Sequence, residues 1–375
     1  MSFKKFDRHQ LRIKKLEHRF SKLSVQTDMV AVTQKPVKLS ENARTLIKAT
    51  TSRILSAREK QRSVILAFGA HTIKNGMAPV LIELLRNGWL THLATNGAGI
   101  VHDWEFAFQG KSSEDVRVNV SQGQFGIWEE TGFFINLALI VGAYEGLGYG
   151  ESVGKMIFQE GLQIPKISYL HHLAVQNMEK DPSLAASAID LAGTIRKFKL
   201  KPGFMSIPHP YKEYSVQAAA YEMKVRFTSH PMFGHDIIYN HPMNHGAAIG
   251  RTALIDFLYF AESVNNLDYG TYMSLGSAVM SPMIFEKSLS MAQNLAIQKN
   301  SHIDNHFIMV VDLAKSEWDW KNRGEPSVDD PAYYLRYCKT FHRMGGEMHY
   351  LTADNRDFLL ELYHNLLKNQ DSINI

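Results

Sequence analysis

The chain alternates short apolar runs with longer segments in which apolar residues recur every three or four positions. VILAF, from Val64 to Phe68, precedes Gly69 and a helix-period segment from Met77 to Arg86. THLAT, from Thr91 to Thr95, precedes a glycine-rich turn and the helical pattern DWEFAF. Near-continuous apolar strands joined by helical crossovers are typical of a parallel sheet buried on both faces.

The same alternation continues toward the C-terminus. Further strand-like runs are Ile135–Val141, Val225–Ser229, Asp236–Tyr239, Thr271–Leu275, Phe307–Val311 and Glu347–Leu351. A helix is predicted over 252–260, and the stretch from Gly154 to Leu200 is mostly helical without a strand candidate. We therefore predict a doubly wound α/β fold with a mostly parallel sheet.

The first residues differ from this body because they are rich in cations. Seven basic residues lie among the first twenty: Lys4, Lys5, Arg8, Arg12, Lys14, Lys15 and Arg19. Ile13, Leu16, Phe20 and Leu23 fall at three- and four-residue steps, which predicts an amphipathic helical arm over 1–45 with a solvated basic face. No Gly/Ser or Pro linker interrupts residues 46–375, so we predict one α/β domain there.

Charge and cysteine usage narrow the class of protein. The 41 Lys and Arg against 37 Asp and Glu give a net charge of +4, too weak a bias to indicate nucleic-acid binding. The most apolar stretch, Gly132–Tyr144, is short for a membrane span and predicts a buried core element. Cys338 is the single cysteine, which excludes an intramolecular disulfide framework and favours a reducing cytoplasm.

In an open parallel sheet, ligands bind beyond the carboxyl ends of the strands. Two turns there are rich in glycine and polar residues, Gly69–Gly76 and Asn96–Asp103, and later strand ends add Gly276, Asp312 and Asp354. Glycines at strand-to-helix turns let a phosphate approach the backbone, so a nucleotide site is one interpretation. Neither turn matches G-x-G-x-x-G, so the second interpretation is that these glycines allow the helices to pack closely on the sheet.

A histidine-rich segment gives a second candidate site. His230, His235, Asp236, His241 and His245 lie within sixteen residues, which raises the alternative of a metal-dependent hydrolase. The segment has no H-E-x-x-H motif and contains a proline, so we predict no metal and place Asp236 in a polar substrate pocket. No phosphate loop of the G-x-x-x-x-G-K-[ST] type occurs.

With these segments in order, the chain resembles the deoxyhypusine synthase family. FGAHTIKNGMAP, ATNGAGIVHDWE, the stretch ending FGHDIIY, TYMSLGSAV, FIMVVDLAKS and YLTADN are similar to successive motifs of that family. The resemblance implies a Rossmann-like sheet, NAD as cofactor, a polyamine or other small amine as substrate and a homotetramer or homodimer. It implies an NAD site formed by Ala70, His71, Thr95, Asn96, Gly97, His102, Asp103, Gly276, Asp312 and Asp354.

The resemblance also implies catalytic residues. Asp236 takes the place of the substrate-pocket aspartate, and Lys339 keeps the family's spacing after Pro331 for a lysine that captures an aminobutyl fragment as an imine. We expect His102 to act as general base, because imidazole titrates near neutral pH. Three catalytic candidates therefore follow: His102, Asp236 and Lys339.

The chain departs from the family at the groups that hold a polycation. Ala332 and Tyr333 replace acidic residues near the lysine, and Ser281 and Pro282 replace a paired histidine. The leading hypothesis is an NAD-dependent enzyme that abstracts hydride from a small amine, with aminoalkyl transfer as an extension. The alternatives are a nucleotide-binding protein of the same fold without redox chemistry, and the metal-dependent hydrolase.

Overall fold

The computed structural model describes residues 3–373, and their contacts divide into two compact units. Unit 1 comprises the described residues up to Thr27, together with Ile100–Tyr221 and Pro231–Asp256. Unit 2 comprises Asp28–Gly99, Glu222–His230 and the described residues from Phe257 onward. Both units are discontinuous in sequence, and the predicted domain boundary at residue 46 stays a prediction.

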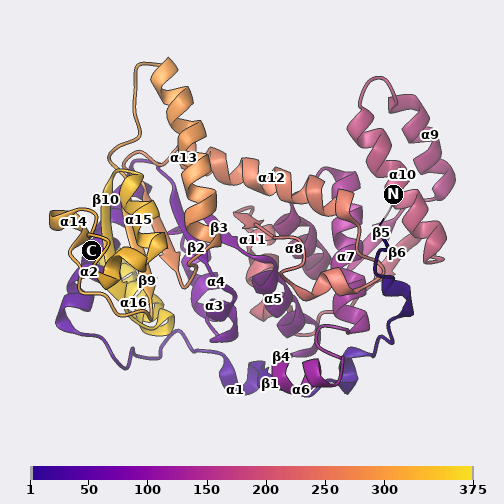
Figure 1. Cartoon of the computed structure of the whole chain (residues 1–375), viewed down its shortest axis with the longest axis horizontal. Helices are drawn as coiled ribbons and strands as arrows, with labels where there is room; N and C mark the ends of the chain where they lie inside the picture. The colour runs from indigo at the N-terminus through magenta and orange to yellow at the C-terminus, as the bar shows by residue number, and fades with distance from the viewer. Residues whose placement is uncertain (1–2, 374–375) are drawn as a thin grey trace. The chain divides into compact units, whose positions relative to one another are not determined.

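Unit 2 is built on a six-stranded, wholly parallel sheet, part of which is labelled in Figure 1. Its strands are β2 (Val64–Phe68), β3 (His92–Thr95), β7 (Arg226–Ser229), β8 (Thr271–Leu275), β9 (Phe307–Asp312) and β10 (Glu347–Thr352). Their spatial order is β10-β9-β8-β2-β3-β7. The predicted doubly wound α/β fold is thus confirmed, and each strand coincides with one of the predicted runs.

Helices cover both faces of this sheet. Successive residues of a strand point to opposite faces, and here the residues on both faces are mostly apolar and buried. The helices of unit 2 are α2 (Glu41–Glu59), α3 (Ala70–Lys74), α4 (Ala78–Arg86), the end of α12 (Gly246–Asn265), α13 (Met280–Gln298), α14 (Trp320–Arg323), the 3-10 helix η5 (Pro331–Tyr334), α15 (Arg336–Arg343) and α16 (Asn355–Ile373). Ile65 and Ala67 of β2 belong to one buried cluster with Phe260, Phe285 and Phe341. Helices α12, α13 and α15 are thereby fixed to one face of the sheet.

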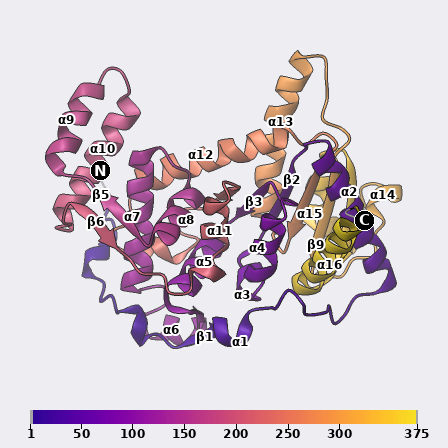
Figure 2. The ribbon, with the colours of Figure 1, turned by 180° about the vertical axis from the view of Figure 1, so that it is seen from behind.

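Unit 1 is mainly helical, with two small antiparallel pairs of strands. Its helices are α5 (Gly97–Gln109), α6 (Val116–Ser121), α7 (Glu129–Glu145), α8 (Tyr149–Gln159), α9 (Ile167–Asn177), α10 (Pro182–Lys197), α11 (Val216–Glu222) and the first part of α12, with 3-10 helices η3 (Lys212–Tyr214) and η4 (Ile237–Asn240). Strand β1 (Ser21–Ser24) pairs with β4 (Lys111–Glu114), and β5 (Gly161–Ile164) with β6 (Gly203–Ser206). Figure 2 shows α9 and α10 side by side near β5 and β6.

Three strand-level predictions in unit 1 are wrong. Ile135–Val141 lies inside α7 and is buried on all sides, and a continuous apolar run does not distinguish a buried helix from a buried strand. The predicted strand Asp236–Tyr239 is replaced by the 3-10 helix η4 (Ile237–Asn240), which Asp236 caps by accepting from the backbone N–H of Ile238. The stretch from Gly154 to Leu200 is not strand-free, since it contains β5.

The predicted amphipathic arm helix is also wrong. The segment forms two 3-10 turns, η1 (Arg8–Gln10) and η2 (Leu16–His18), then β1 and the short α1 (Val25–Asp28). Its backbone pairs with the body of unit 1: the Lys14 N–H donates to the Ile127 carbonyl, and the Leu16 N–H to the Glu130 carboxylate. These tertiary bonds replace the bonds that a continuous helix would make.

Helical hydrophobicity gives one finding about membranes. Among the described residues, no single helix is long and apolar enough to cross a bilayer. Helices α7 and α8 pass the length and composition test only when taken together, and they are bent by 110° at the break between them.

Candidate functional site

The strand order of unit 2 reverses between β2 and β8. From β2 the chain moves to β3 and then β7 on one side, and it returns to β8, β9 and β10 on the other. The chain therefore continues from β2 and from β8 toward opposite edges of the sheet, and no crossover connection passes directly between the carboxyl ends of these two strands. This reversal is the position at which open α/β sheets bind their ligands.

The turns after β2 and β8 approach each other at two glycines. A Cβ on Gly69 would lie 2.2 Å from the carbonyl oxygen of Gly276, so no side chain fits at residue 69. The Gly69 N–H donates to the Leu275 carbonyl at 3.0 Å, which fixes the separation of the two turns. Gly276 has φ +53° and an exposed surface, and a Cβ there would meet no atom within 4 Å. The backbone at the reversal is thus closely packed and open on one side.

The neighbouring strand β3 ends in residues that shape its turn. The Thr95 hydroxyl donates to the Phe68 carbonyl at 3.0 Å and holds the ends of β2 and β3 together. The Asn96 side chain accepts from the Gly99 N–H at 3.0 Å and so caps α5, which begins at Gly97. Half-buried Asn96 is the first polar side chain beyond this strand.

The first turn after β2 carries Ala70 and His71 in the short helix α3. Ala70 is half-buried and His71 is exposed. Partial burial, with the nearby Lys74 charge, lowers the pKa of His71, so the ring is neutral at physiological pH. Asn355 at the start of α16 donates to the Thr72 hydroxyl at 3.2 Å, which ties this turn to the turn after β10.

Asp312 is the last residue of β9, and Asp354 lies two residues beyond β10, so both are at the same edge of the sheet. Asp312 is half-buried and accepts from the Ala314 N–H at 3.0 Å. Burial and the nearby Asp312 charge raise the pKa of Tyr337 to about 12. Asp354 accepts from the Arg356 N–H at 2.8 Å. The structure therefore brings eight of the predicted residues to one edge of one sheet: Ala70, His71, Thr95, Asn96, Gly97, Gly276, Asp312 and Asp354.

Lys339 lies in α15 of unit 2, where its Nζ is 3.3 Å from the centre of the Tyr333 ring. This contact is a cation–π interaction, which holds the ammonium group over the ring. The neighbouring Cys338 is fully buried. Imine formation at Lys339 stays a prediction.

His102 and Asp103 lie in the part of α5 that belongs to unit 1. The His102 Nδ1 is 2.8 Å from the Ser112 hydroxyl, which also donates to Glu105. Asp103 is fully buried, and its two oxygens accept from the Ser215 hydroxyl, the Val216 and Gln217 N–H groups and the Gln217 side chain. We assign Asp103 a structural role as the cap of α11, since these donors occupy its carboxylate.

Asp236 lies in a buried acid and tyrosine cluster within unit 1. Its Oδ2, the Tyr149 hydroxyl and the Tyr239 hydroxyl are each buried without a hydrogen-bond partner among the described residues. Burial raises the pKa of Asp236 to about 6. Burial and the charges of Asp236, Tyr239 and Asp256 raise the pKa of Tyr149 well above its usual range. Tyr149 is not predictable from the local pattern, because it lies about ninety positions from Asp236, and Tyr239 is three residues from Asp236 without any motif that marks it.

The raised pKa of Asp236 predicts a specific pH dependence of stability. The folded chain binds this proton more tightly than the unfolded chain, so the cost of an ionised Asp236 grows as pH rises from about 4 to about 6. Asp236→Asn keeps the cap of η4 and removes that cost. We expect it to gain about 2–3 kcal/mol over the native protein at pH 7 and nothing near pH 4, measured by urea unfolding across this range. The exposed substitution Glu179→Gln is the control, and an equal gain at both pH values would contradict the assignment.

The four histidines of the histidine-rich segment 230–245 contact different partners, or none among the described residues that could share a metal ion with them. His241 contacts Glu129 at 3.4 Å, and His245 lies 3.7 Å from Asp190. His230 contacts Thr228 in unit 2, and His235 is exposed. Within residues 3–373, no group of three or more His, Cys, Asp or Glu side chains is arranged to hold a metal ion.

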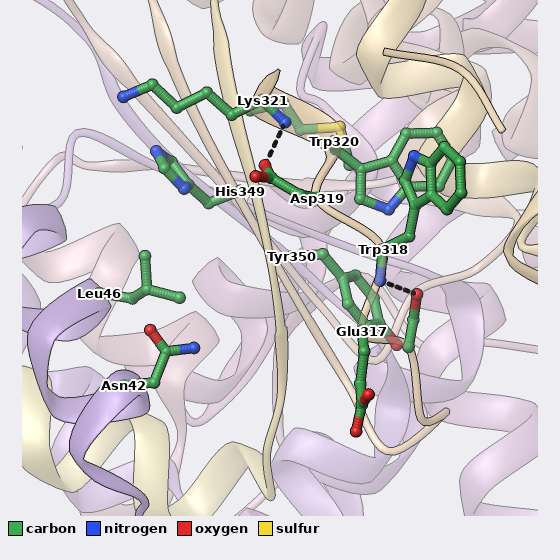
Figure 3. A pocket seen from close by; sticks show the side chains of 11 residues that line it. Asn42, Leu46, Glu317, Trp318, Asp319, Trp320, Lys321, His349 and Tyr350 are labelled. Atoms are coloured by element: carbon green, nitrogen blue, oxygen red, sulfur yellow. Dashed lines mark hydrogen bonds between the residues drawn. The ribbon is translucent and has the colours of Figure 1, made fainter. Parts of the chain in front are cut away.

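A cavity of about 310 Å³ lies beside the edge strand β10 (Figure 3). It is lined by Asn42 and Leu46 of α2, the loop Ser316–Lys321, and Met348, His349 and Tyr350 of β10. Lys321 and His349 both contact Glu347, so the nearby charges are largely paired. Strands β9 and β8 lie between β10 and the strand-order reversal, and no sequence motif marks this cavity.

No protein-family model matches the chain, and no curated protein matches it. Among solved structures, it is similar to AgrE in a complex with ornithine and NAD+, with TM-score 0.45, 13% identity, and coverage of 90% of this chain and 34% of AgrE. It is similar to a conserved LOR/SDH protein from Methanococcus maripaludis S2, with TM-score 0.45, 11% identity, and coverage of 90% and 73% of the two chains. It is also similar to a protein described as a deoxyhypusine synthase from Entamoeba histolytica, with TM-score 0.39, 11% identity, and coverage of 88% and 90%. The chain thus spans about a third of AgrE's length.

Proposed function

We propose that the chain is an NAD-dependent enzyme whose dinucleotide lies across the carboxyl edge of the unit 2 sheet. The observation that carries this proposal is the strand order β10-β9-β8-β2-β3-β7, which is the order of the dinucleotide-binding α/β sheet with its reversal between β2 and β8. A dinucleotide bound there has one half over β2, β3 and β7 and the other over β8, β9 and β10.

The backbone at the reversal fits a pyrophosphate. Gly276 leaves open space for a ligand, and the nineteen-residue helix α13 begins four residues later. The Ser277 hydroxyl accepts from the Ser281 N–H at 3.2 Å, and Pro282 has no N–H, so a phosphate there would rely mainly on the helix dipole and on the N–H groups of the preceding turn. The N-terminus of a helix favours an anion through its N–H groups and its dipole. Gly69 and Gly276 would give the phosphates room and not donors, because their N–H groups donate to the Leu275 and Val311 carbonyls. Asn96, Asp312 and Asp354 would offer acceptors for ribose or amide groups. When bound, NAD would supply a hydride acceptor.

The Asp236 cluster supports an amine as the substrate class. A buried carboxylate oxygen without a donor is costly unless a ligand or a proton supplies one. An ammonium group donates three hydrogen bonds and carries the charge that would keep Asp236 ionised. The Tyr149 and Tyr239 hydroxyls would add neutral acceptors to that group.

The finer chemistry of the proposal concerns His102 and Lys339. His102 would take a proton from the amine, with its orientation fixed by Ser112. Aminoalkyl transfer through Lys339 would require its ammonium group to leave the Tyr333 ring and lose a proton. Hydride abstraction from the amine without transfer needs neither change at Lys339.

Calorimetric titration of the full chain with NAD tests the proposal, and Ala278→Asp probes the location. Ala278 is exposed in the turn between Gly276 and α13, so an added carboxylate there would repel the phosphates without disturbing the core. We expect Ala278→Asp to weaken NAD binding about tenfold or more and the uncharged Ala278→Asn to weaken it much less. Equal affinity in the two variants would place the dinucleotide elsewhere.

Addition of polyamines and amino acids to the NAD complex then tests the chemistry. Appearance of reduced-nicotinamide absorbance identifies an amine oxidation. Tight NAD binding without reduction by any amine would favour the non-redox alternative. That alternative has one structural observation in its favour, because Ser281 is fully buried and bonded to Tyr272 where the related family has a histidine.

A further inference from the structure

Unit 2 contains a chain of hydrogen bonds that runs from exposed Arg226 through buried side chains to His230, the first residue beyond β7. Arg226 donates to the Ser263 hydroxyl at 2.9 Å, and that hydroxyl lies 2.8 Å from the His92 Nδ1. The His92 Nε2 is 2.8 Å from the Thr228 hydroxyl, which is 3.0 Å from the His230 Nε2. The side chain of Phe260 lies against both imidazoles, with ring centres 5.5 Å and 5.2 Å away.

The direction of this chain follows from its members. Guanidinium only donates, so the Ser263 oxygen accepts from Arg226. Ser263 is 1% exposed, and among the described residues His92 is the one acceptor its hydroxyl contacts, so it donates to the His92 Nδ1. The His92 proton is then on Nε2 and is donated to Thr228. The Thr228 hydroxyl, also 1% exposed, therefore donates to the His230 Nε2.

We propose that this relay holds His230 as a neutral imidazole with its proton on Nδ1, so that it donates a hydrogen bond to an oxygen of the bound dinucleotide. This inference rests on the proposed function. The His230 Nδ1 has no protein partner among residues 3–373 and is not among the fully buried polar atoms that lack one. This atom therefore keeps a small exposed area at the strand end, where His230 as a whole is 9% exposed. The His230 N–H also donates to the Thr95 carbonyl at 2.8 Å, which fixes the residue beside the β3 turn.

The location of His230 indicates which ligand atoms its Nδ1–H group would donate to. His230 lies on the side of the reversal formed by β2, β3 and β7, where one half of a dinucleotide rests in a sheet of this order. Hydroxyl, phosphate and carbonyl oxygens on that half are acceptors. Burial lowers the pKa of His230 to about 3, so this donor stays neutral and acts by hydrogen bonding and not by proton transfer. Arg226, Ser263, His92 and Thr228 are positioning residues, because they act through His230.

Histidine-selective 15N NMR of the full, ligand-free chain tests the relay without NAD. We expect the His230 signal, assigned by its loss in His230→Gln, to show a protonated Nδ1 and an unprotonated Nε2. Thr228→Val should shift the proton toward Nε2, Thr228→Ser should restore Nδ1, and Thr51→Val should change nothing. Thr51 is a matched control because it is buried in unit 2 and bonds to a carbonyl of its own helix. A protonated Nε2 in the native protein would overturn the relay.

Titration of the same sample with NAD tests the ligand contact. We expect the His230 Nδ1 resonance to shift on saturation, and the dissociation constant of NAD to rise about three- to tenfold in Thr228→Val and His230→Gln, the loss of one neutral hydrogen bond. NAD binding with an unchanged His230 resonance would overturn the contact while the proposed function stands. Absence of NAD binding to the native chain would overturn the proposed function and the contact together, and the tautomer would still decide the relay.

Discussion

Arg19→Met is expected to destabilise the protein by about 3–5 kcal/mol, because it leaves a buried carboxylate without its counter-charge. The side chains of Arg19 and Glu105 are each 1% exposed, and they form a two-pronged ion pair with N–O distances of 2.6 and 2.8 Å. Glu105 also accepts from Ser112 and Thr131. Burial alone would raise the pKa of Glu105, but the Arg19 charge and the hydrogen bonds from Arg19 and Ser112 together outweigh burial and lower that pKa. Urea unfolding of the variant measures the loss.

Two further variants separate the ion pair from mere packing. Arg12→Met removes an exposed cation from the same segment and should change the free energy of unfolding by less than about 0.5 kcal/mol. The double variant Arg19→Met with Glu105→Met removes both charges, and we expect it to recover part of the loss. If Arg19→Met unfolds at the same urea concentration as the native protein, the pair does not hold the N-terminal segment to unit 1.

The sequence predicts the sheet of unit 2 well because the information is local. VILAF and TYMSL are short, mainly apolar runs bounded by turn residues, and both form fully buried strands. INLALIV has the same composition and yet is helical, since Glu129 and Glu130 begin a longer segment that ends at Gly146. The missed strands, such as β5 and β6, are short and lie in segments without a continuous apolar run, so their pairing is decided by tertiary contacts.

The candidate site divides in the same way. Residues at strand ends, such as Asn96, Gly276 and Asp312, are predictable because parallel strands place their carboxyl ends at one edge. The pair Arg19 and Glu105 and the relay from Arg226 to His230 are not, because each joins elements that the sequence separates by tens of residues. The sequence pattern places Arg19 on a solvated basic face, whereas in the structure its ion pair with Glu105 buries it.

Gly69→Ala should abolish or strongly weaken NAD binding and should also lower stability. The new Cβ would lie 2.2 Å from the Gly276 carbonyl oxygen. A Cβ is fixed by its own backbone and a carbonyl oxygen is part of the backbone, so no side-chain rotation relieves this clash. The turns after β2 and β8 must then separate, which breaks the bond from the Gly69 N–H to the Leu275 carbonyl. We expect a loss of about 1–3 kcal/mol in the free energy of unfolding and at least about a tenfold rise in the dissociation constant of NAD.

The control for this variant is Gly250→Ala in α12, where a Cβ would meet no atom within 4 Å. Alanine is the better helix former, so this change should leave NAD affinity unaltered and stabilise the protein by up to about 1 kcal/mol. Urea unfolding and calorimetry on the same samples separate the two effects. A destabilised Gly69→Ala protein that binds NAD with native affinity would show that the dinucleotide does not cross between β2 and β8. Weakened binding in a folded Gly69→Ala protein would tie the cofactor to the one point where the strand order reverses.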